Sequence, residues 1–180
     1  MSEAHIAAAT PAGLLRRLGA MTSDTLVVMG LLLLASLPTV PLLKWLGARA
    51  MAPSEVGWGW VVCYWSWLLA IWAGFFGYFW TRSGQTVGMK AWRIRVERMD
   101  GGLLSWSGAI KRWVAAALPW LPCLVVLWIS EQIHSSSLKN LGQGLLLLGV
   151  AGLLQMYFSP ERRTWHDRVS ASRIIMLPKL

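Results

Sequence analysis

The sequence predicts an all-α membrane protein, specifically a four-transmembrane-helix bundle with a small cytoplasmic β-hairpin or short-strand element. The chain is 56% hydrophobic and contains 13 tryptophans, which is more apolar than most soluble domains and rich in a residue that favours membrane interfaces. The stretch 25–43 has no ionisable side chain. As a helix it would extend about 28 Å, close to the thickness of a bilayer's hydrocarbon core.

Four apolar stretches are the predicted membrane spans, at about 25–43, 56–79, 113–129 and 141–158. An amphipathic lead-in helix over 12–23 is expected to continue into the first span, which Pro38 and Pro41 should kink or terminate. The second span is long enough to cross with some tilt. Pro119 and Pro122 interrupt the third span, and the glycines of the fourth allow close approach of a neighbouring helix.

The predicted domain organisation is an N-terminal tail over 1–13, a membrane domain over 14–177 and a C-terminal end over 178–180. A basic cytoplasmic loop over 81–112 divides the membrane domain. The end of that loop, about 107–112, is expected to form an interfacial helix that leads back to the membrane.

Alternating residues in the loop predict a short strand. Apolar residues occupy every second position of 92–97, a period that is typical of a half-buried strand. An Asp-Gly-Gly turn follows from Asp100, and 103–106 is expected to return as the partner strand of a hairpin. A further short strand is expected over 172–177.

Lysine and arginine are unevenly distributed along the chain. Fourteen lie in the N-terminal segment, the 81–112 loop and the C-terminal tail, whereas three lie in the other two loops. The positive-inside rule therefore places both termini in the cytoplasm. The net charge of +9 is divided by apolar stretches and forms no single patch, so no nucleic-acid partner is predicted. Anionic lipid headgroups are the expected partner of the basic loop.

Arg17 and Asp24 stand immediately before the first span. Their spacing is about two helical turns, so both side chains should project from one face, about 10 Å apart along the axis. A carboxylate at this boundary is costly unless it is paired, solvated or protonated. Asp24 is therefore either a proton or cation site or the structural partner of a basic residue. Arg17 is either a topology anchor or the guanidinium partner of Asp24 or Asp167.

Asp167 follows the fourth span in the sequence Thr-Trp-His-Asp-Arg. It is expected to act as a cap or turn residue or to join the charge cluster with Arg17. His166 is expected either to titrate near neutral pH or, as a lone histidine beside an arginine, to be simply interfacial. Arg168 would support the same cluster. The histidines lack metal-ligand spacing, so no metal or other cofactor is predicted. No hydrolase constellation is present, so no enzyme activity is predicted.

The sequence Gly-Gln-Thr-Val-Gly places Gly84 and Gly88 four residues apart. It is not a P-loop because no Gly-Lys-Ser or Gly-Lys-Thr follows. We expect it to let the chain turn tightly after the second span. An alternative is a small anion bound among Thr86, Lys90 and the turn amides.

Three stretches carry a family resemblance. They are RRLGAMTSD with Arg17 and Asp24, GQTVGMKAWRIRV followed by DGG, and ERRTWHDRVSASRII with Asp167. In this order they resemble the RDD family, which is named for one arginine and two aspartates. The resemblance runs from about residue 14 to residue 175 and implies that Arg17, Asp24 and Asp167 are the signature residues.

The resemblance implies a multi-pass protein of the bacterial inner (cytoplasmic) membrane. The function that it implies is a transport component for a small ion, either a cation or a proton, or for a small solute. Four spans enclose little volume, so a pathway would need a homo-oligomer or a membrane-protein partner. The alternative is a non-transporting membrane scaffold or assembly partner that uses its basic cytoplasmic face. The scarcity of polar residues in the spans weakens the transport interpretation for an isolated chain, but the resemblance keeps transport as the leading hypothesis.

Overall fold

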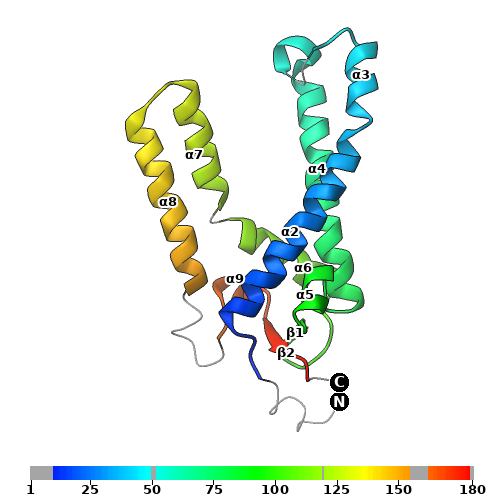
Figure 1. Cartoon of the computed structure of the whole chain (residues 1–180), viewed down its shortest axis with the longest axis vertical. Helices are drawn as coiled ribbons and strands as arrows, with labels where there is room; N and C mark the ends of the chain where they lie inside the picture. Colours follow the sequence, from blue (N-terminus) through cyan, green and yellow to red (C-terminus); the bar gives the residue numbers. More distant parts are fainter. Residues whose placement is uncertain (1–9, 50–51, 119, 155–161, 179–180) are drawn as a thin grey trace.

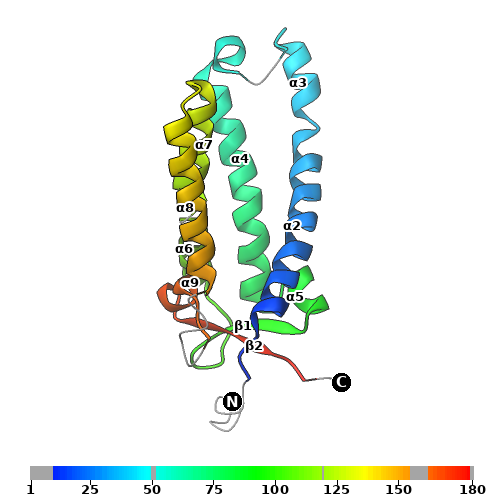
Figure 2. The ribbon, with the colours of Figure 1, turned by 60° about the vertical axis from the view of Figure 1, so that its left-hand side comes forward.

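The computed structural model describes residues 10–49, 52–118, 120–154 and 162–178. Long helices extend in one direction from a base that is made of short elements (Figures 1 and 2). The base consists of α5 (Val87–Ala91), β1 (Ile94–Arg98), α9 (Trp165–Val169), β2 (Ser172–Met176) and the adjoining ends of α2, α4 and α6. The backbone N–H of Met176 donates to the carbonyl of Thr10 (2.9 Å), so both ends of the described chain lie in the base.

The first pair of long helices contains α2 (Leu14–Ser36), α3 (Thr39–Trp45) and α4 (Pro53–Arg82). The predicted lead-in helix does continue into the first apolar stretch, because α2 is unbroken from Leu14. The chain breaks at Leu37 and Pro38, where the prolines were expected to interrupt it. The hydroxyls of Ser36 and Tyr64 are hydrogen-bonded (3.0 Å) and join α2 to α4.

The second pair contains α7 (Trp120–Gln132) and α8 (Ser136–Leu154), which follow α6 (Trp106–Ala117). The expected interfacial helix is part of α6. The predicted third span, 113–129, straddles α6 and α7, which are bent by 41° relative to each other. Gly142 of α8 packs closely on Leu127 of α7, as the glycine content suggested. The last residues of the predicted fourth span, 155–158, lie outside the described residues.

Among the described residues, two helices are long and apolar enough to cross a membrane, within Leu14–Trp45 and Ser54–Arg82, and a third span is added if the bent pair counts as one. The predicted number of four spans is therefore supported only in part. At most 6% of each apolar window is buried within the chain. These helices expose many large apolar side chains, as helices that face lipid do.

The small sheet differs from the predicted hairpin. Strand β1 pairs antiparallel with β2, with Ile94 opposite Met176 and Arg98 opposite Ser172. The expectation that 103–106 would be the partner strand is wrong. Leu104 is buried in the core of the base, and Trp106 begins α6 after Ser105, whose side chain accepts from the Gly108 N–H (3.2 Å). An isolated two-residue-turn hairpin buries little apolar surface, whereas β2 brings further apolar side chains to β1.

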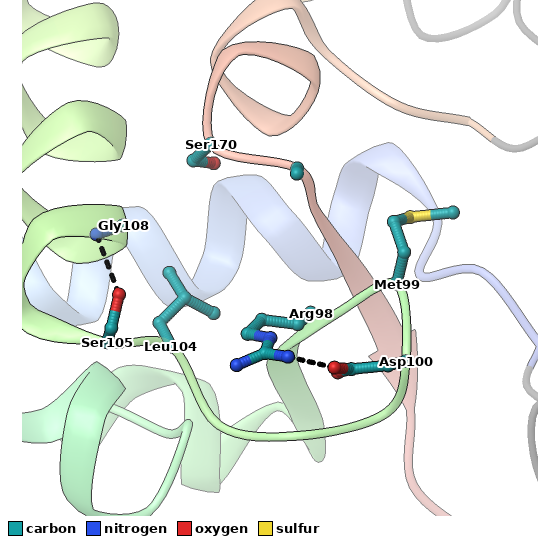
Figure 3. A pocket seen from close by; sticks show the side chains of 8 residues that line it. Arg98, Met99, Asp100, Leu104, Ser105, Gly108 and Ser170 are labelled. Atoms are coloured by element: carbon teal, nitrogen blue, oxygen red, sulfur yellow. Dashed lines mark hydrogen bonds and ion pairs between the residues drawn. The ribbon is translucent and has the colours of Figure 1, made fainter.

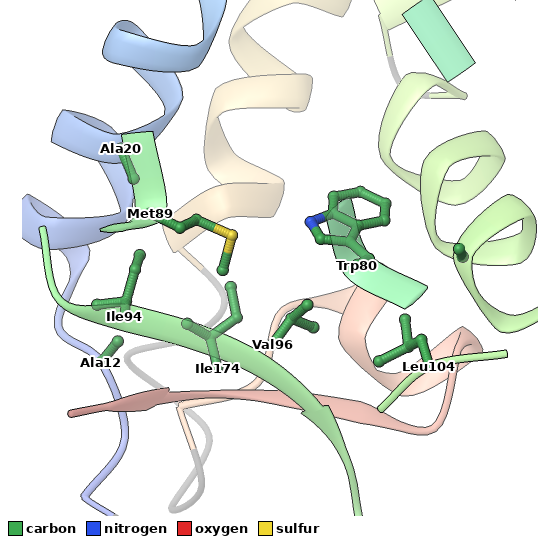
Figure 4. Close-up of a cluster of buried hydrophobic side chains, with 9 residues drawn as sticks. Ala12, Ala20, Trp80, Met89, Ile94, Val96, Leu104 and Ile174 are labelled. Carbon is green, nitrogen blue, oxygen red and sulfur yellow. The ribbon is translucent and has the colours of Figure 1, made fainter. Parts of the chain in front are cut away.

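Both edges of the sheet are covered. The N–H of Ala12 donates to the carbonyl of Ile174 on the outer edge of β2 (3.0 Å), and the N–H of Val96 donates to the carbonyl of Gly84 on the outer edge of β1 (2.8 Å). Nine buried apolar residues pack around the sheet (Figure 4), namely Ala12, Ala20, Trp80, Met89, Ile94, Val96, Leu104, Ala109 and Ile174. The core of the base thus combines segments from nearly the whole length of the chain.

Candidate functional site

Asp167 lies at the start of the short helix α9. Its Oδ2 accepts hydrogen bonds from the backbone N–H of Thr164 (3.0 Å) and from the Thr164 hydroxyl (2.8 Å). The carboxylate therefore occupies the N-terminal end of the helix, where the first backbone N–H groups have no intrahelical partner. The side chain is fully buried. The prediction that Asp167 is a capping residue is consistent with this geometry.

Two arginines from distant parts of the chain converge on Asp167. Arg17 of α2 donates through Nη1 to Oδ2 (2.9 Å), and Arg112 of α6 donates through Nη1 to Oδ1. Both arginines are at most 5% exposed. We call Arg17, Arg112 and Asp167 the charge cluster. It fastens α2, α6 and α9 together at one point.

The two arginines of the charge cluster make further contacts. Arg17 donates through Nε to the carbonyl of Ala12 (3.1 Å) and through Nη2 to the carbonyl of Arg162 (2.8 Å). Arg112 also donates to the hydroxyl of Ser172 in β2 (2.6 Å). Its guanidinium lies over the ring of Trp80, 5.3 Å from the ring centroid, a favourable cation–π geometry. The cluster therefore also connects α4 and the sheet.

The electrostatics of the cluster keep Asp167 ionised and His166 neutral. Burial raises the pKa of Asp167, but the positive charges of Arg112 and Arg17 and the bond from Thr164 lower it more, so it lies well below its ordinary value. Burial, together with the charge of Arg112, lowers the pKa of His166 to about 4. The lowered pKa therefore disfavours the alternative in which His166 titrates near neutral pH. The ring instead contacts the Thr164 hydroxyl (2.9 Å).

Asp24 lies apart from this cluster and contacts α5. Its Oδ1 accepts from the backbone N–H of Gly88 (2.8 Å), and its Oδ2 accepts from the hydroxyl of Thr86. Thr86 is the N-cap of α5, and its side chain accepts from the Met89 N–H (3.2 Å). Asp24 is 4% exposed. Among the described residues, the partners of Asp24 are a hydroxyl and a backbone amide. Within this part of the chain, Asp24 is therefore not the ion-pair partner of a basic residue.

The two glycines of the central motif have separate roles. Gly84 has φ +71°, and a Cβ there would fall 2.5 Å from the carbonyl oxygen of Val96. Gly88 lies so close to α2 that a Cβ would fall 2.3 Å from the carbonyl oxygen of Ala20. The expected tight turn is present at Gly84. The alternative of a bound anion is not favoured, because the Gly88 N–H, one of the amides that would bind it, already donates to the carboxylate of Asp24.

Sequence reasoning did not single out Arg112. It counted Arg112 only as one of the basic residues of the loop. A usable signal was present, because Arg112 is three residues from both Ala109 and Ala115, and all three are buried on one face of α6. Arg168, which was expected to support the cluster, is exposed. Within the described residues, no group of three histidine, cysteine or acidic side chains has the arrangement of a metal site.

A pocket of about 260 Å³ opens between the end of β1, the start of α6 and the turn before β2 (Figure 3). Its polar side chains already have partners within the chain. Arg98 pairs with Asp100, and the hydroxyl of Ser170 donates to the carbonyl of His166 (2.7 Å). We therefore do not include this pocket in the candidate site.

The chain is thus a small, mainly helical protein with two or three candidate membrane spans, in which buried arginine–aspartate pairs join the helices to a polar base. The model of the RDD family matches residues 11–171. The chain therefore belongs to the RDD family, and the family predicted from the three motifs is confirmed. No curated protein matches the chain. No solved structure matches it either.

Proposed function

We propose that the chain is a four-span protein of the bacterial inner membrane, with both termini and the base in the cytoplasm, and that it acts as a non-transporting scaffold or assembly partner. It binds another membrane protein or a second copy of itself and catalyses no reaction. The observation that carries this proposal is that all three signature side chains are buried and bonded within the chain. Residues in such bonds stabilise an architecture and are not free for a moving ion or solute.

The apolar helices support the same proposal. The α7–α8 pair packs mainly on itself, and α2 and α4 contact each other and the base. Large apolar side chains such as Trp65, Trp67 and Leu147 are more than half exposed. In a bilayer these faces contact lipid or the helices of a partner. The orientation follows from the base, where exposed cations gather, because positive residues favour the cytoplasmic side.

Transport of a cation or proton is the second candidate, and Asp24 is the residue that favours it. A carboxylate held by a hydroxyl beside the start of an apolar helix is a group that can exchange a proton. We still prefer the scaffold, because Asp24 is closed in by α5 and its oxygens already accept two hydrogen bonds.

Flux measurements separate the two candidates. Purified protein in liposomes should show no cation-dependent proton flux above that of empty liposomes, while cross-linking in native membranes should yield a discrete complex. The Asp24→Asn variant is the test for transport, and Asp100→Asn, which removes an exposed carboxylate of the base, is its matched control. Flux that Asp24→Asn abolishes and Asp100→Asn retains, with both variants folded, would overturn the scaffold proposal.

The orientation is tested by labelling. Cys63 and Cys123 are replaced by alanine, and single cysteines are placed at Arg49, between α3 and α4, and at Arg98 in the base. A membrane-impermeant maleimide should label the cysteine at 49 in intact spheroplasts and the cysteine at 98 only after lysis. The reverse pattern would place the base on the outer side of the membrane.

A further inference from the structure

Acidic and basic side chains of the base differ in where they lie. Asp24, Glu97 and Asp167 are each at most 4% exposed. Among the described residues of the base, the exposed carboxylate is that of Asp100, which pairs with Arg98. By contrast, the exposed cations of the base are Arg82, Lys90, Arg93, Arg98, Lys111, Arg162 and Arg168. Exposed cations therefore outnumber exposed carboxylates on the described surface of the base by more than the residue composition of the base suggests.

Contacts with α2 place α5 beside the start of the first apolar run. Gly88 bonds to Asp24, directly before the apolar run begins. The indole of Trp92, which follows α5, packs on Gly19 and donates to the hydroxyl of Ser23 (3.4 Å). Gly19 lies about 8 Å along the helix axis from Asp24. That distance equals the depth of one headgroup layer, about 5–8 Å, so a bilayer whose hydrocarbon core begins at Asp24 would place Trp92 at the level of the lipid headgroups.

Three cations lie close to Trp92, two of them in the sequence and one through a contact with its backbone. Lys90 and Arg93 are exposed on either side of Trp92 in the sequence, and Arg16 donates through Nη1 to the carbonyl of Trp92 (3.1 Å). Trp92 itself is 39% exposed. We call Arg16, Lys90, Trp92 and Arg93 the α5 patch. Asp24, which accepts a hydrogen bond from Gly88 of α5, is buried, and no described carboxylate forms an ion pair with the cations of the patch.

We propose that the α5 patch binds the phosphate of an anionic phospholipid in the leaflet next to the base. Charge complementarity supports this occupant, because Lys90 and Arg93 are exposed whereas the carboxylate of Asp24 is buried. The indole supports it as well, because its apolar ring and polar N–H suit the layer between acyl chains and water. The exposed Val87 of α5 would contact the upper acyl chains. This proposal requires only that α2 crosses a bilayer and is independent of whether the chain is a scaffold or a transporter.

Native mass spectrometry of the full chain in detergent tests the proposal, with phosphatidylglycerol and phosphatidylcholine of identical acyl chains as the probes. The wild-type protein should bind phosphatidylglycerol preferentially. The Lys90→Gln variant should lower that preference about fivefold, since one cation near a charged lipid surface contributes about that factor. The Lys90→Gln/Arg93→Gln double variant should lower it further. Preference for the anionic lipid should also decrease as salt increases.

The matched control is Arg162→Gln/Arg168→Gln, which removes two exposed cations from the base and leaves the α5 patch intact. It should change the lipid preference by less than about twofold. An equal loss in both double variants would show that net charge, and not the α5 patch, attracts the lipid, and would overturn the proposal. An absence of preference in the wild-type protein would overturn it too. A bound partner protein that the Lys90→Gln variant loses, with lipid binding unchanged, would assign the α5 patch to that partner and would also overturn the proposal. Lys90 is exposed at the end of α5, so the single variant keeps the fold.

Discussion

The base and the long helices of this protein are stabilised in opposite ways. In the base, side chains from α2, α4, α6, α9 and β2 meet through the charge cluster. The buried carboxylates of Asp24 and Glu97 are also bonded, to the Gly88 N–H and to Arg173 respectively. In the long helices, large apolar residues are exposed, and the described polar contact between α2 and α4 is the single Ser36–Tyr64 bond. The base is thus held together by specific polar bonds, whereas the long helices present apolar side chains to the medium around them.

The difference shows where the family signature acts. Arg17 and Asp24 both belong to α2, yet each bonds to a different element of the base, Arg17 to α9 and Asp24 to α5. Desolvating an arginine or an aspartate is costly, and only good geometry with further hydrogen bonds compensates for it. Such bonds specify one arrangement of the base on the helices, which apolar contacts with lipid cannot do.

The strongest test of this comparison removes the shared carboxylate. Asp167→Asn leaves Arg17 and Arg112 buried without a counter-ion, and the free energy of unfolding should fall by about 3–5 kcal/mol. Titration with SDS in mixed micelles, followed by circular dichroism, measures the change. Asp100→Asn, at an exposed position, should change it by less than about 0.5 kcal/mol. Equal effects at the two positions would contradict a structural role for the cluster.

The contact between α2 and α5 is tested by adding one methyl group. Gly88→Ala places a Cβ against the backbone of Ala20, so α5 must move away and the bond to Asp24 is strained or lost. We expect a destabilisation of about 2–3 kcal/mol. Gly144→Ala in α8 is the control, because a Cβ there meets nothing within 4 Å, and it should be neutral or slightly stabilising. The same unfolding titration compares the two, and a neutral Gly88→Ala would show that the close approach is not required.

The pH dependence of stability is tested through His166. Its pKa in the folded protein is about 4, below the ordinary value of 6.5, so between these values the unfolded chain binds a proton that the folded chain does not. Stability should therefore fall as the pH decreases from 6.5 to 4, by about 2 kcal/mol between pH 7 and pH 5. Because the pKa of Asp167 is lowered, this carboxylate stays ionised throughout this range, and its contribution to stability is lost only in stronger acid.

His166→Gln should remove this decrease and leave a flatter profile of unfolding free energy against pH. A wild-type profile that is flat between pH 7 and pH 5 would show that the imidazole is not held neutral in the folded protein.

The smallest effect is expected within the long helices. Ser36→Ala removes the hydrogen bond to Tyr64, and it should cost only about 0.6 kcal/mol, the average for interhelical hydrogen bonds in membranes. A double-mutant cycle with Tyr64→Phe measures this coupling. A coupling energy as large as the loss expected for Asp167→Asn would contradict the contrast between the base and the long helices.

Several features of the fold were predictable because they are local. The continuous helix from Leu14, the break at Pro38 and the strands near Ile94 and Ser172 follow from hydropathy, proline chemistry and a period of two. The partner of β1 was not predictable in this way. The Asp-Gly-Gly turn suggested a local hairpin, but burial of Leu104 and the capped start of α6 favour pairing with β2, more than seventy residues away.

The sequence by itself determined the membrane character of the chain, its family and the three signature residues, since apolar length, charge distribution and motifs are properties of local sequence. Only the tertiary structure decided the partners of those residues. It brought Arg112 to Asp167, directed Asp24 to the amide of Gly88 and lowered the pKa of His166. Spacing along a helix fixes the face from which a side chain projects, but the groups that meet it there belong to other elements, and their arrangement depends on how the whole base packs.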